Sequence, residues 1–493
     1  MSEITLNKNI EYNIDLFKKD FSDDDSIVYR RFQNESGRRK FCLIYIKSMV
    51  NDEIMTENIL KPIMSEDIKK HENSIEFLDY IVDKIVSVNE VEKLKDYTKL
   101  VDNLYIGKSI LFIDGFSQGA VLNTLEWNAR AIKEPISETV IKGPREGFNE
   151  VIYTNISLIR RRIISKQLKV KFREIGKVTK TKVCICYIED IAKEEIIQEV
   201  ERRLDKIDID AILDTGYIEE FISDKPMSLF KTSQTTEKPD TVCGKLLEGR
   251  IAIICNGSPT VITTPFVFLE YFQVDEDYYQ NYYYATFNRL LRYLAFFLTT
   301  SVPAIYISLT NYHQELIPTQ LMLSIYESRQ GVPFPTFLEA LIMIIVFELI
   351  RESGIRISKY SGSAISIVGA LVVGEAAVQA RLVSQPMIIV IGITGISNFL
   401  LPKMANSTIY IRIIFVLLAS FLGLYGYVFG VIHLFLHLFS IKSFGIPYML
   451  NMNSMEDKIN IKDAYIRAPW WYMDMRNKLI SKKRNRKKDV SNN

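Results

Sequence analysis

The sequence has little of what metal sites, disulfide frameworks and nucleic-acid surfaces are built from. Its five cysteines, Cys42, Cys184, Cys186, Cys243 and Cys255, are odd in number and include no Cys-x-x-Cys pair, which argues against a disulfide framework or a zinc site. The net charge of +2 is too small to indicate a nucleic-acid-binding protein. We therefore expect free thiols in a reducing compartment, no metal, no cofactor and no nucleic-acid partner.

The first 30 residues lack the apolar core of a signal sequence, whereas the part after residue 288 is rich in long apolar stretches. These stretches are Leu290–Leu309, Leu338–Ile350, about Ile365–Val383, Met387–Leu401 and Ile409–Ser440. About 20 apolar residues cross the bilayer core as a helix. The last stretch is long enough for two short spans bent near Gly423, Gly426 and Gly430. The sequence predicts an all-α polytopic membrane domain of six spans, with five as the alternative.

Basic residues indicate how these spans are oriented. Arg289 and Arg292 lie at the start of the first span, and Lys482–Lys488 make the C-terminal tail basic. Because positive residues prefer the cytoplasmic side, we expect the N-terminal region and the tail in the cytoplasm. A further basic cluster, Arg160–Arg162, is expected to be a solvated helix face.

The N-terminal region mixes strand and helix patterns and predicts two cytoplasmic lobes of the α+β or α/β class. Strands are expected at Phe41–Met49, Ser109–Asp114 and Lys182–Ile188, and helices near Val121–Ala131, at Glu150–Lys171 and at Lys193–Lys206. Asn256-Gly257 between two apolar runs predicts a hairpin. The predicted boundaries are a polar segment 1–25, a first lobe 26–140, a second lobe 141–275, a membrane domain 276–445 and a basic tail 446–493.

Two motifs resemble parts of enzyme sites but are incomplete. Gly115-Phe-Ser-Gln-Gly119 matches a hydrolase nucleophile elbow, yet His71, the one histidine of the soluble part, precedes Ser117 instead of following it. Gly107-Lys108-Ser109 resembles the end of a phosphate-binding loop, but Asp102 stands where that loop needs glycine. We expect a non-enzymatic protein and explain the glycines of the first motif by a tight strand-to-helix turn.

The third predicted span is dense in small residues and contains a carboxylate. Its pore-lining candidates are Ser366, Gly369, Ala370, Val373, Gly374 and Glu375. Small residues permit close helix packing in lipid. They also suit a water-lined pathway, in which Glu375 would attract cations. Glu339 and Glu348 are further intramembrane candidates, and their alternative role is pairing with Arg351, Arg356 or Arg381.

Several long motifs then indicate a family. They are Ile141–Glu150 with Gly143, Pro144, Arg145, Glu146, Gly147 and Phe148; His313–Thr319 with His313, Gln314, Glu315 and Pro318; Val332–Pro335 with Pro333 and Pro335; Phe347–Gly354; Ile365–Val372; and Ser443–Tyr448. Together they resemble the A subunit of GerA-type bacterial spore germinant receptors over about four fifths of the chain. Serines in Arg351–Ser358 depart from the family pattern.

The resemblance implies a subunit of the spore inner membrane that acts in nutrient sensing and signal transduction. It implies assembly with a second polytopic receptor subunit, which senses the nutrient, and with a lipoprotein subunit. It further implies that A subunits oligomerise, as a pentamer, into an ion channel that releases monovalent cations when a nutrient binds. The alternatives are a secondary transporter of a small solute or germinant, and a scaffold that only holds the other subunits together.

Overall fold

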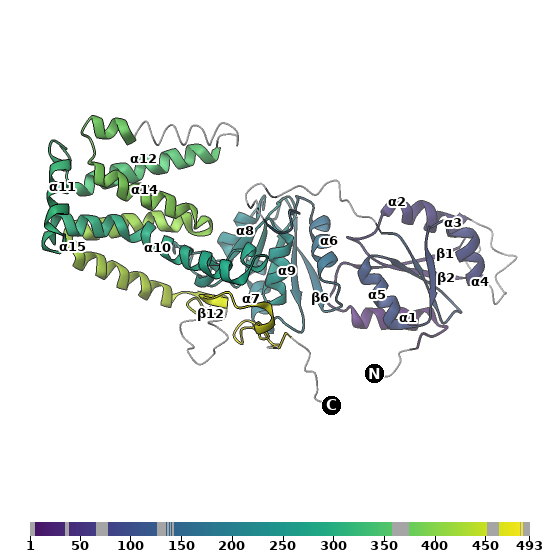
Figure 1. Ribbon diagram of the computed structural model, residues 1–493. Helices are drawn as coiled ribbons and strands as arrows, with labels where there is room; N and C mark the ends of the chain where they lie inside the picture. The colour runs from purple at the N-terminus through teal and green to yellow at the C-terminus, as the bar shows by residue number, and fades with distance from the viewer. Residues whose placement is uncertain are drawn as a thin grey trace, which may run out of the picture.

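The computed structural model describes residues 5–34, 39–65, 77–125, 135, 138, 140, 142–356, 374–450, 463–483 and 485–486. It has three parts in a row (Figure 1): a first lobe, a second lobe and a helical domain, with the second lobe in the middle. The C-terminal segment returns from the helical domain to the second lobe.

Lobe one is a five-stranded antiparallel sheet with helices on both faces. Its elements are α1 Ile10–Asp20, β1 Ile27–Gln33, β2 Lys40–Ile46, α2 Asp52–Ile54, the π-helix η1 Met55–Leu60, α3 Lys61–Ser65, α4 Phe77–Tyr80, the π-helix η3 Ile81–Ile85, β3 Val91–Leu94, α5 Tyr97–Ile106, β4 Ser109–Ile113 and β5 Gly119–Leu122. The strand order is β1-β2-β4-β5-β3. Helix α1 lies in the predicted polar segment 1–25, but its apolar stripe, Ile10, Ile14 and Phe17, is buried in the lobe-one core, so the lobe begins earlier than predicted.

Lobe two has the same architecture. Its elements are α6 Ile152–Arg162, β6 Leu168–Ile175, β7 Thr181–Ile188, α7 Glu194–Asp205, α8 Thr215–Ile222, β8 Gln234–Thr236, α9 Pro239–Leu247, β9 Ile251–Cys255 and β10 Val261–Thr264. The strand order β6-β7-β9-β10-β8 repeats that of lobe one, and all pairs are again antiparallel. The N-terminal region is therefore of the α+β class, because it contains no parallel βαβ unit among the described residues.

The two lobes are an internal repeat with a spacing of 142 residues. In lobe one, Asn13 accepts a hydrogen bond from the Asn7 amide at 2.9 Å and donates to the Asn7 carbonyl at 2.7 Å. In lobe two, Asn155 does the same with Asn149, at 2.9 and 2.6 Å. The Gly115 amide donates to the Lys8 carbonyl at 2.9 Å, and the corresponding residues of lobe two make the same bond at 2.8 Å. The pairing of equivalent atoms at a constant spacing indicates duplication of one unit.

Two of the helices expected in this region were wrong, and the other five expected elements are confirmed. Residues 119–122 form strand β5 instead of a helix, so the Gly115–Gly119 motif is the turn of a β-hairpin and not a strand-to-helix turn. The helix expected over Glu150–Lys171 ends at Arg162, because the chain from Leu168 joins the sheet as β6. The hairpin at Asn256-Gly257, the helix at Lys193–Lys206 and the strands at Phe41–Met49, Ser109–Asp114 and Lys182–Ile188 are confirmed.

A buried ion pair joins the lobes. Arg160, expected on a solvated helix face, is 2% exposed and donates to Asp24 at 2.5 Å and to the Ser26 hydroxyl at 2.8 Å. Next to it, the Asp25 amide donates to the Val170 carbonyl of edge strand β6 at 2.9 Å. A charge removed from water needs a partner of this kind, so the basic cluster serves partly as the contact between the lobes.

The helical domain consists of α10 Tyr282–Asn311, the short η7 Gln314–Leu316, α11 Thr319–Arg329, α12 Thr336–Arg356, α14 Gln385–Phe399, η8 Pro402–Met404 and α15 Ala405–Ser440. By length and composition, α10 and the Pro402–Ser440 segment could each cross a membrane. Most of the third predicted span lies outside the described residues, so the number of spans stays a prediction.

Helix α15 turns back on itself at Gly423, as the sequence predicted. Gly423 has φ 59° and ψ −140°, which is not helical. Phe415 and Tyr427, on opposite sides of this residue, make a ring contact with centroids 5.6 Å apart. A Cβ on Gly430 would lie 3.0 Å from Phe415, although 15 residues of straight helix would separate the two by about 22 Å. The two arms of α15 are therefore antiparallel neighbours.

Candidate functional site

The joint between lobe two and α10 is a buried network of charged side chains. After β10 the chain runs through η5 Phe268–Phe272 and η6 Asp275–Tyr278 into α10. Asp277, 2% exposed, accepts two hydrogen bonds from Arg292 at 2.7 and 2.8 Å and two from Arg289 at 3.3 Å. Both arginines lie in the first three turns of α10. A bidentate arginine fixes orientation as well as distance, so the start of α10 is held against the end of lobe two.

The C-terminal segment enters the same network. Arg289, fully buried, donates to the Asp463 carbonyl at 2.5 Å and to its carboxylate at 3.1 Å. The Tyr278 hydroxyl donates to the same carboxylate at 2.9 Å. Three parts of the chain that are far apart in sequence, the lobe-two connection, α10 and the segment after residue 462, therefore meet at one guanidinium group.

A second ion cluster supports the connection from inside lobe two. Glu270 of η5 pairs with Arg250 at 2.5 Å and with Lys245 of α9. Burial by itself would raise the pKa of Glu270, but Arg250 and Lys245 hold that pKa at about 2. Burial lowers the pKa of Lys245 to about 8 despite the neighbouring carboxylate. The cluster thus locks η5 onto α9 through charge.

A cavity of about 450 Å³ opens beside this joint. Its walls come mainly from α9, η5, η6 and the C-terminal segment. The charged and aromatic side chains that line it include Arg162 of α6, Lys403 of η8, Asp240, Lys245, Glu270, Asp275 and Trp470. Several of these charges are paired: Lys245 with Glu270, and both Asp240 and Asp275 with the nearby Lys238. Among the described residues there is no group of three or more His, Cys, Asp or Glu side chains that could hold a metal ion.

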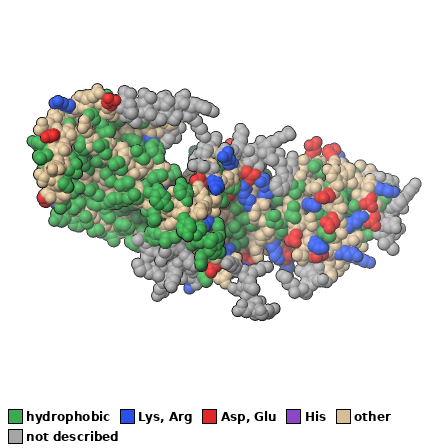
Figure 2. Space-filling view, in the orientation of Figure 1, with side chains coloured by type: hydrophobic (Ala, Val, Ile, Leu, Met, Phe, Trp, Pro, Cys, Tyr) green, Lys and Arg blue, Asp and Glu red, His purple; other side chains and the backbone are tan. Residues whose placement is uncertain are grey.

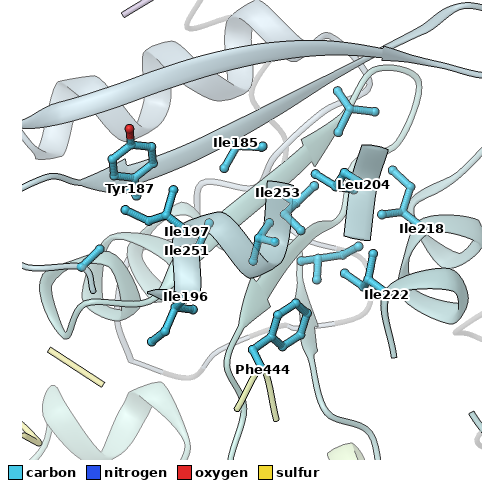
Figure 3. Close-up of a cluster of buried hydrophobic side chains, with 14 of the residues drawn as sticks. Ile185, Tyr187, Ile196, Ile197, Leu204, Ile218, Ile222, Ile251, Ile253 and Phe444 are labelled. Carbon is cyan, nitrogen blue, oxygen red and sulfur yellow. The ribbon is translucent and has the colours of Figure 1, made fainter. Parts of the chain in front are cut away.

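The end of α15 makes a second connection to lobe two. The Ser228 hydroxyl lies 2.9 Å from His437 Nε2, and Lys225 donates to the Ser440 hydroxyl at 2.8 Å. Beyond the helix, Asp224 accepts from the Phe444 amide at 2.9 Å. Figure 3 shows the Phe444 ring among the isoleucines of α7, α8 and β9. Lobe two is thus attached to both the first helix (α10) and the last helix (α15) of the helical domain.

The first family motif packs against this joint. Gly143 has φ +132°, and a Cβ there would lie 2.8 Å from the Tyr279 ring, just before α10. Glu146 pairs with Arg161 and Arg162 of α6, each at 2.6 Å. Phe148 is buried in lobe two, as is Gly147, whereas Pro144 is partly exposed and Arg145 exposed. The glycine is required where the motif touches the chain leading into α10.

The second and third motifs lie at the far end of the helical domain. His313 stacks edge-on to Tyr425 with centroids 6.0 Å apart and lies 3.8 Å from Glu315. Gln314 donates to the Thr310 carbonyl at 2.9 Å. Pro318 precedes the first residue of α11, and the Pro335 carbonyl accepts the first amide bonds of α12, with the exposed Pro333 two residues earlier. These residues shape the loop between α10 and α12 around the α15 reversal.

The two candidate carboxylates of α12, Glu339 and Glu348, have different partners. Glu339, fully buried, accepts hydrogen bonds from the Ser384 amide and hydroxyl at 2.5 Å, so it caps the start of α14. This partner differs from the arginine pairing that was its alternative role. Glu348 does pair with Arg351, at 2.9 Å. Its second partner is Arg412 of α15, at 3.7 Å, which also donates to the Thr299 carbonyl of α10 at 2.9 Å. Arg412 therefore links three helices.

Comparison with known proteins identifies the family. The family model described as Bacillus/Clostridium GerA spore germination protein matches residues 15–479. The chain belongs to the GerA family. It is 39% identical over 482 residues to Spore germination protein KA of Bacillus subtilis, covering 97% of this chain and 88% of that protein. It is 35% identical to Spore germination protein B1 of the same species, covering 96% and 97%.

A solved structure is also similar. The N-terminal domain of the A subunit of the Bacillus megaterium spore germinant receptor GerK3 is 30% identical in sequence, with a TM-score of 0.44. The match covers 54% of this chain and 99% of that domain. The family model and the relatives at 35–39% identity, and not this structure, confirm the resemblance of the GerA motifs at the level of the family.

In this GerA protein the pore-lining candidates are described only at their C-terminal end. Ser366, Gly369, Ala370 and Val373 lie outside the described residues. Gly374 and Glu375 begin a helical stretch that reaches residue 379. A Cβ on Gly374 would meet no atom within 4 Å, and Glu375 is exposed and accepts from Gln379 at 3.2 Å. The surfaces of both residues are thus open in a single copy.

Sequence reasoning missed the residues that hold this GerA protein together at its joints. Asp277, Asp463 and Arg412 were not singled out, and Arg289 was used only as an indicator of topology. An available signal was the pattern of Arg289 and Arg292, spaced so that both face one side of a helix, shortly after the acidic run Asp275–Asp277.

Proposed function

We propose that this GerA protein is the A subunit of a spore germinant receptor, located in the spore inner membrane with both lobes in the cytoplasm. It would act without enzymatic chemistry, as a membrane channel and signal-transducing component. It would assemble with other A subunits, as a pentamer, and with a second polytopic subunit and a lipoprotein subunit. Nutrient binding elsewhere in the receptor would open the channel and release monovalent cations.

The observation that carries this proposal is the double attachment of lobe two to the helical domain. Asp277 holds the start of α10, and Phe444, just after α15, is buried in the core of lobe two. A rigid-body rotation of lobe two must therefore move both helices together, and such rotations are a common form of gating. Arg412 of α15 contacts both α10 and α12. Through these contacts the movement would reach α12, the helix that precedes the small-residue segment.

Glu375 is the carboxylate proposed to attract cations, and its replacement tests the channel. We expect Glu375→Gln to reduce nutrient-evoked cation release from spores while the protein remains in the membrane, because an exposed carboxylate raises the local cation concentration. Glu220→Gln, which removes an exposed carboxylate from α8 of lobe two, is the matched control and should release cations normally. Unchanged release with Glu375→Gln would reject this role.

A secondary transporter is the second candidate, favoured by the break of α15 at Gly423, since transporters use discontinuous helices. Flux through liposomes containing the purified receptor separates the two functions. A channel conducts passively without saturating at low solute concentration, whereas a transporter saturates and couples its solute to an ion. Saturable flux coupled to an ion would show that the protein is a transporter and not a channel.

A further inference from the structure

An aromatic tail segment, residues 463–483, lies beside the start of α10. It contains η9 Trp470–Tyr472, the three consecutive aromatic residues of the C-terminal region. Trp470 donates from its indole nitrogen to the Tyr278 carbonyl at 3.4 Å. The rings of Trp471 and Tyr282 meet edge to face with centroids 6.0 Å apart. The fold therefore brings together two aromatic groups that are about 190 residues apart in the sequence.

These aromatic rings face outward. Trp471 is 64% exposed and Tyr472 59%, while Tyr283 of α10, close to them, is 72% exposed. Figure 2 shows that the hydrophobic surface of the helical domain continues as far as its boundary with lobe two. A cluster of large exposed apolar side chains marks a contact surface, and here the cluster is continuous with the helices proposed to cross the membrane.

The length of α10 places this cluster at the level of the lipid headgroups. Its 30 residues rise about 45 Å, whereas the hydrocarbon core is about 30 Å thick. The first turns of α10, with Tyr282 and Tyr283, must therefore project beyond the hydrocarbon toward lobe two. Tryptophan and tyrosine favour that zone because the ring is apolar and its N–H or O–H can meet water and headgroups.

The same segment is basic. Its residues include the five bases Arg467, Arg476, Lys478, Lys482 and Lys483, against the two acids Asp463 and Asp474. Lys478, Lys482 and Lys483 are exposed. Lysines beside a membrane surface are attracted to anionic lipids. We propose that the aromatic tail segment is an interfacial anchor that inserts Trp470, Trp471 and Tyr472 among the headgroups of an anionic leaflet.

The anchor would connect the leaflet to both ends of the joint. On one side of η9 lies Asp463, which binds Arg289, and on the other lies Ile480, which is buried in the core of lobe two. The position of lobe two relative to the membrane would therefore be fixed at the lipid surface as well as through α10 and α15. This inference concerns lipid contact and is independent of whether the protein conducts ions.

Tryptophan fluorescence tests the anchor in the full-length chain. The sequence has three tryptophans, so Trp127→Phe leaves Trp470 and Trp471 as the reporters. The protein is placed in liposomes of phosphatidylcholine and phosphatidylglycerol with bromine on the acyl chains near the headgroup. We expect a large loss of emission relative to unbrominated lipid, and a smaller loss when phosphatidylglycerol is left out.

The matched control carries one tryptophan in lobe one, Tyr12→Trp in a chain with Trp127, Trp470 and Trp471 each changed to phenylalanine. Tyr12 is about half exposed, so its replacement should be quenched by aqueous iodide and not by brominated lipid. The proposal is overturned if Trp470 and Trp471 behave like this control. It is also overturned if neither quencher reaches them, which would show that protein covers the segment. Equal quenching without phosphatidylglycerol would overturn the role of anionic lipid.

Discussion

The two lobes have one fold, but they complete their cores differently. In lobe one, the sheet face opposite α1 and α5 is covered by the lobe's own helices, from α2 to η3. In lobe two, the equivalent face is covered by α7 and α8 together with residues from beyond the helical domain, namely Phe444, Ile446, Leu450 and Ile480. Duplication thus gave one self-contained unit and one unit whose core includes the chain that leaves the last helix. Lobe two shares its core with the chain that follows the helical domain, whereas lobe one, among the residues that the structure describes, contacts lobe two through Arg160 and β6.

Removal of Asp277 should have the largest effect, because it releases lobe two from α10. Asp277→Ala leaves Arg289 and Arg292 without their shared carboxylate, and breaking a buried ion pair from one side costs about 3–5 kcal/mol. Hydrogen exchange in lipid nanodiscs should show loss of protection over residues 275–292, with lobe one unchanged.

The control for this variant is Asp23→Ala. The Asp23 carboxylate is half exposed and 4.0 Å from Lys171, so its loss should cost less than about 1 kcal/mol. Full protection of residues 275–292 in Asp277→Ala would show that the joint does not depend on this carboxylate.

Phe444→Ala should be next, because it tests the shared core directly. Phe444 is 3% exposed and packs against the Arg203 guanidinium at 4.2 Å. Truncating a buried phenylalanine costs about 3 kcal/mol. Exchange of β7 and β9 amides should become faster, while β2 and β4 stay protected. Faster exchange in both lobes alike would contradict the separate cores.

Acid should weaken lobe two through Glu270. Its folded pKa of about 2 lies below the usual 4.5, so its contribution to stability is fully present above pH 4.5 and is lost as the pH falls toward 2. The expected loss is about 3 kcal/mol. Glu270→Gln should make the stability of lobe two, measured by exchange at β9, less dependent on pH across this range. An unaltered pH dependence would assign acid lability to other groups.

The local elements of lobe two were predictable where one pattern dominated. The hairpin follows from Asn256-Gly257, and helix α7 from the spacing of Ile196, Ile197, Val200 and Leu204, all buried. Strand β5 was not predictable, because a short apolar run such as residues 119–122 fits a buried helix as well as a strand. Its antiparallel pairing with β4 is decided by the whole sheet.

The contacts at the joints and the internal repeat could not be predicted from the sequence, because they depend on residues far apart in the chain. Arg160 and Asp24 are more than 130 residues apart, and neither local sequence indicates that the two side chains form a pair. The repeat does leave a trace, since Gly107 and Gly249 share a positive φ at the spacing of 142 residues, as do Gly115 and Gly257. Pairs of glycines are too common to reveal a duplication until their equivalent conformations are seen.

The smallest and most symmetrical effect should come from the two equivalent asparagines. Asn13 and Asn155 are both buried, and each bridges the amide and the carbonyl of the residue six positions earlier. Asn13→Ala and Asn155→Ala should each cost about 2 kcal/mol, because a backbone amide loses its partner, and each loss should appear as faster exchange in its own lobe. Asn103→Ala, at a partly exposed position, should cost less than about 0.5 kcal/mol. Unequal costs for the two buried sites would mean that the lobes kept the geometry of their ancestor but not its energetics, with the attachment of lobe two to the helices as the cause to test.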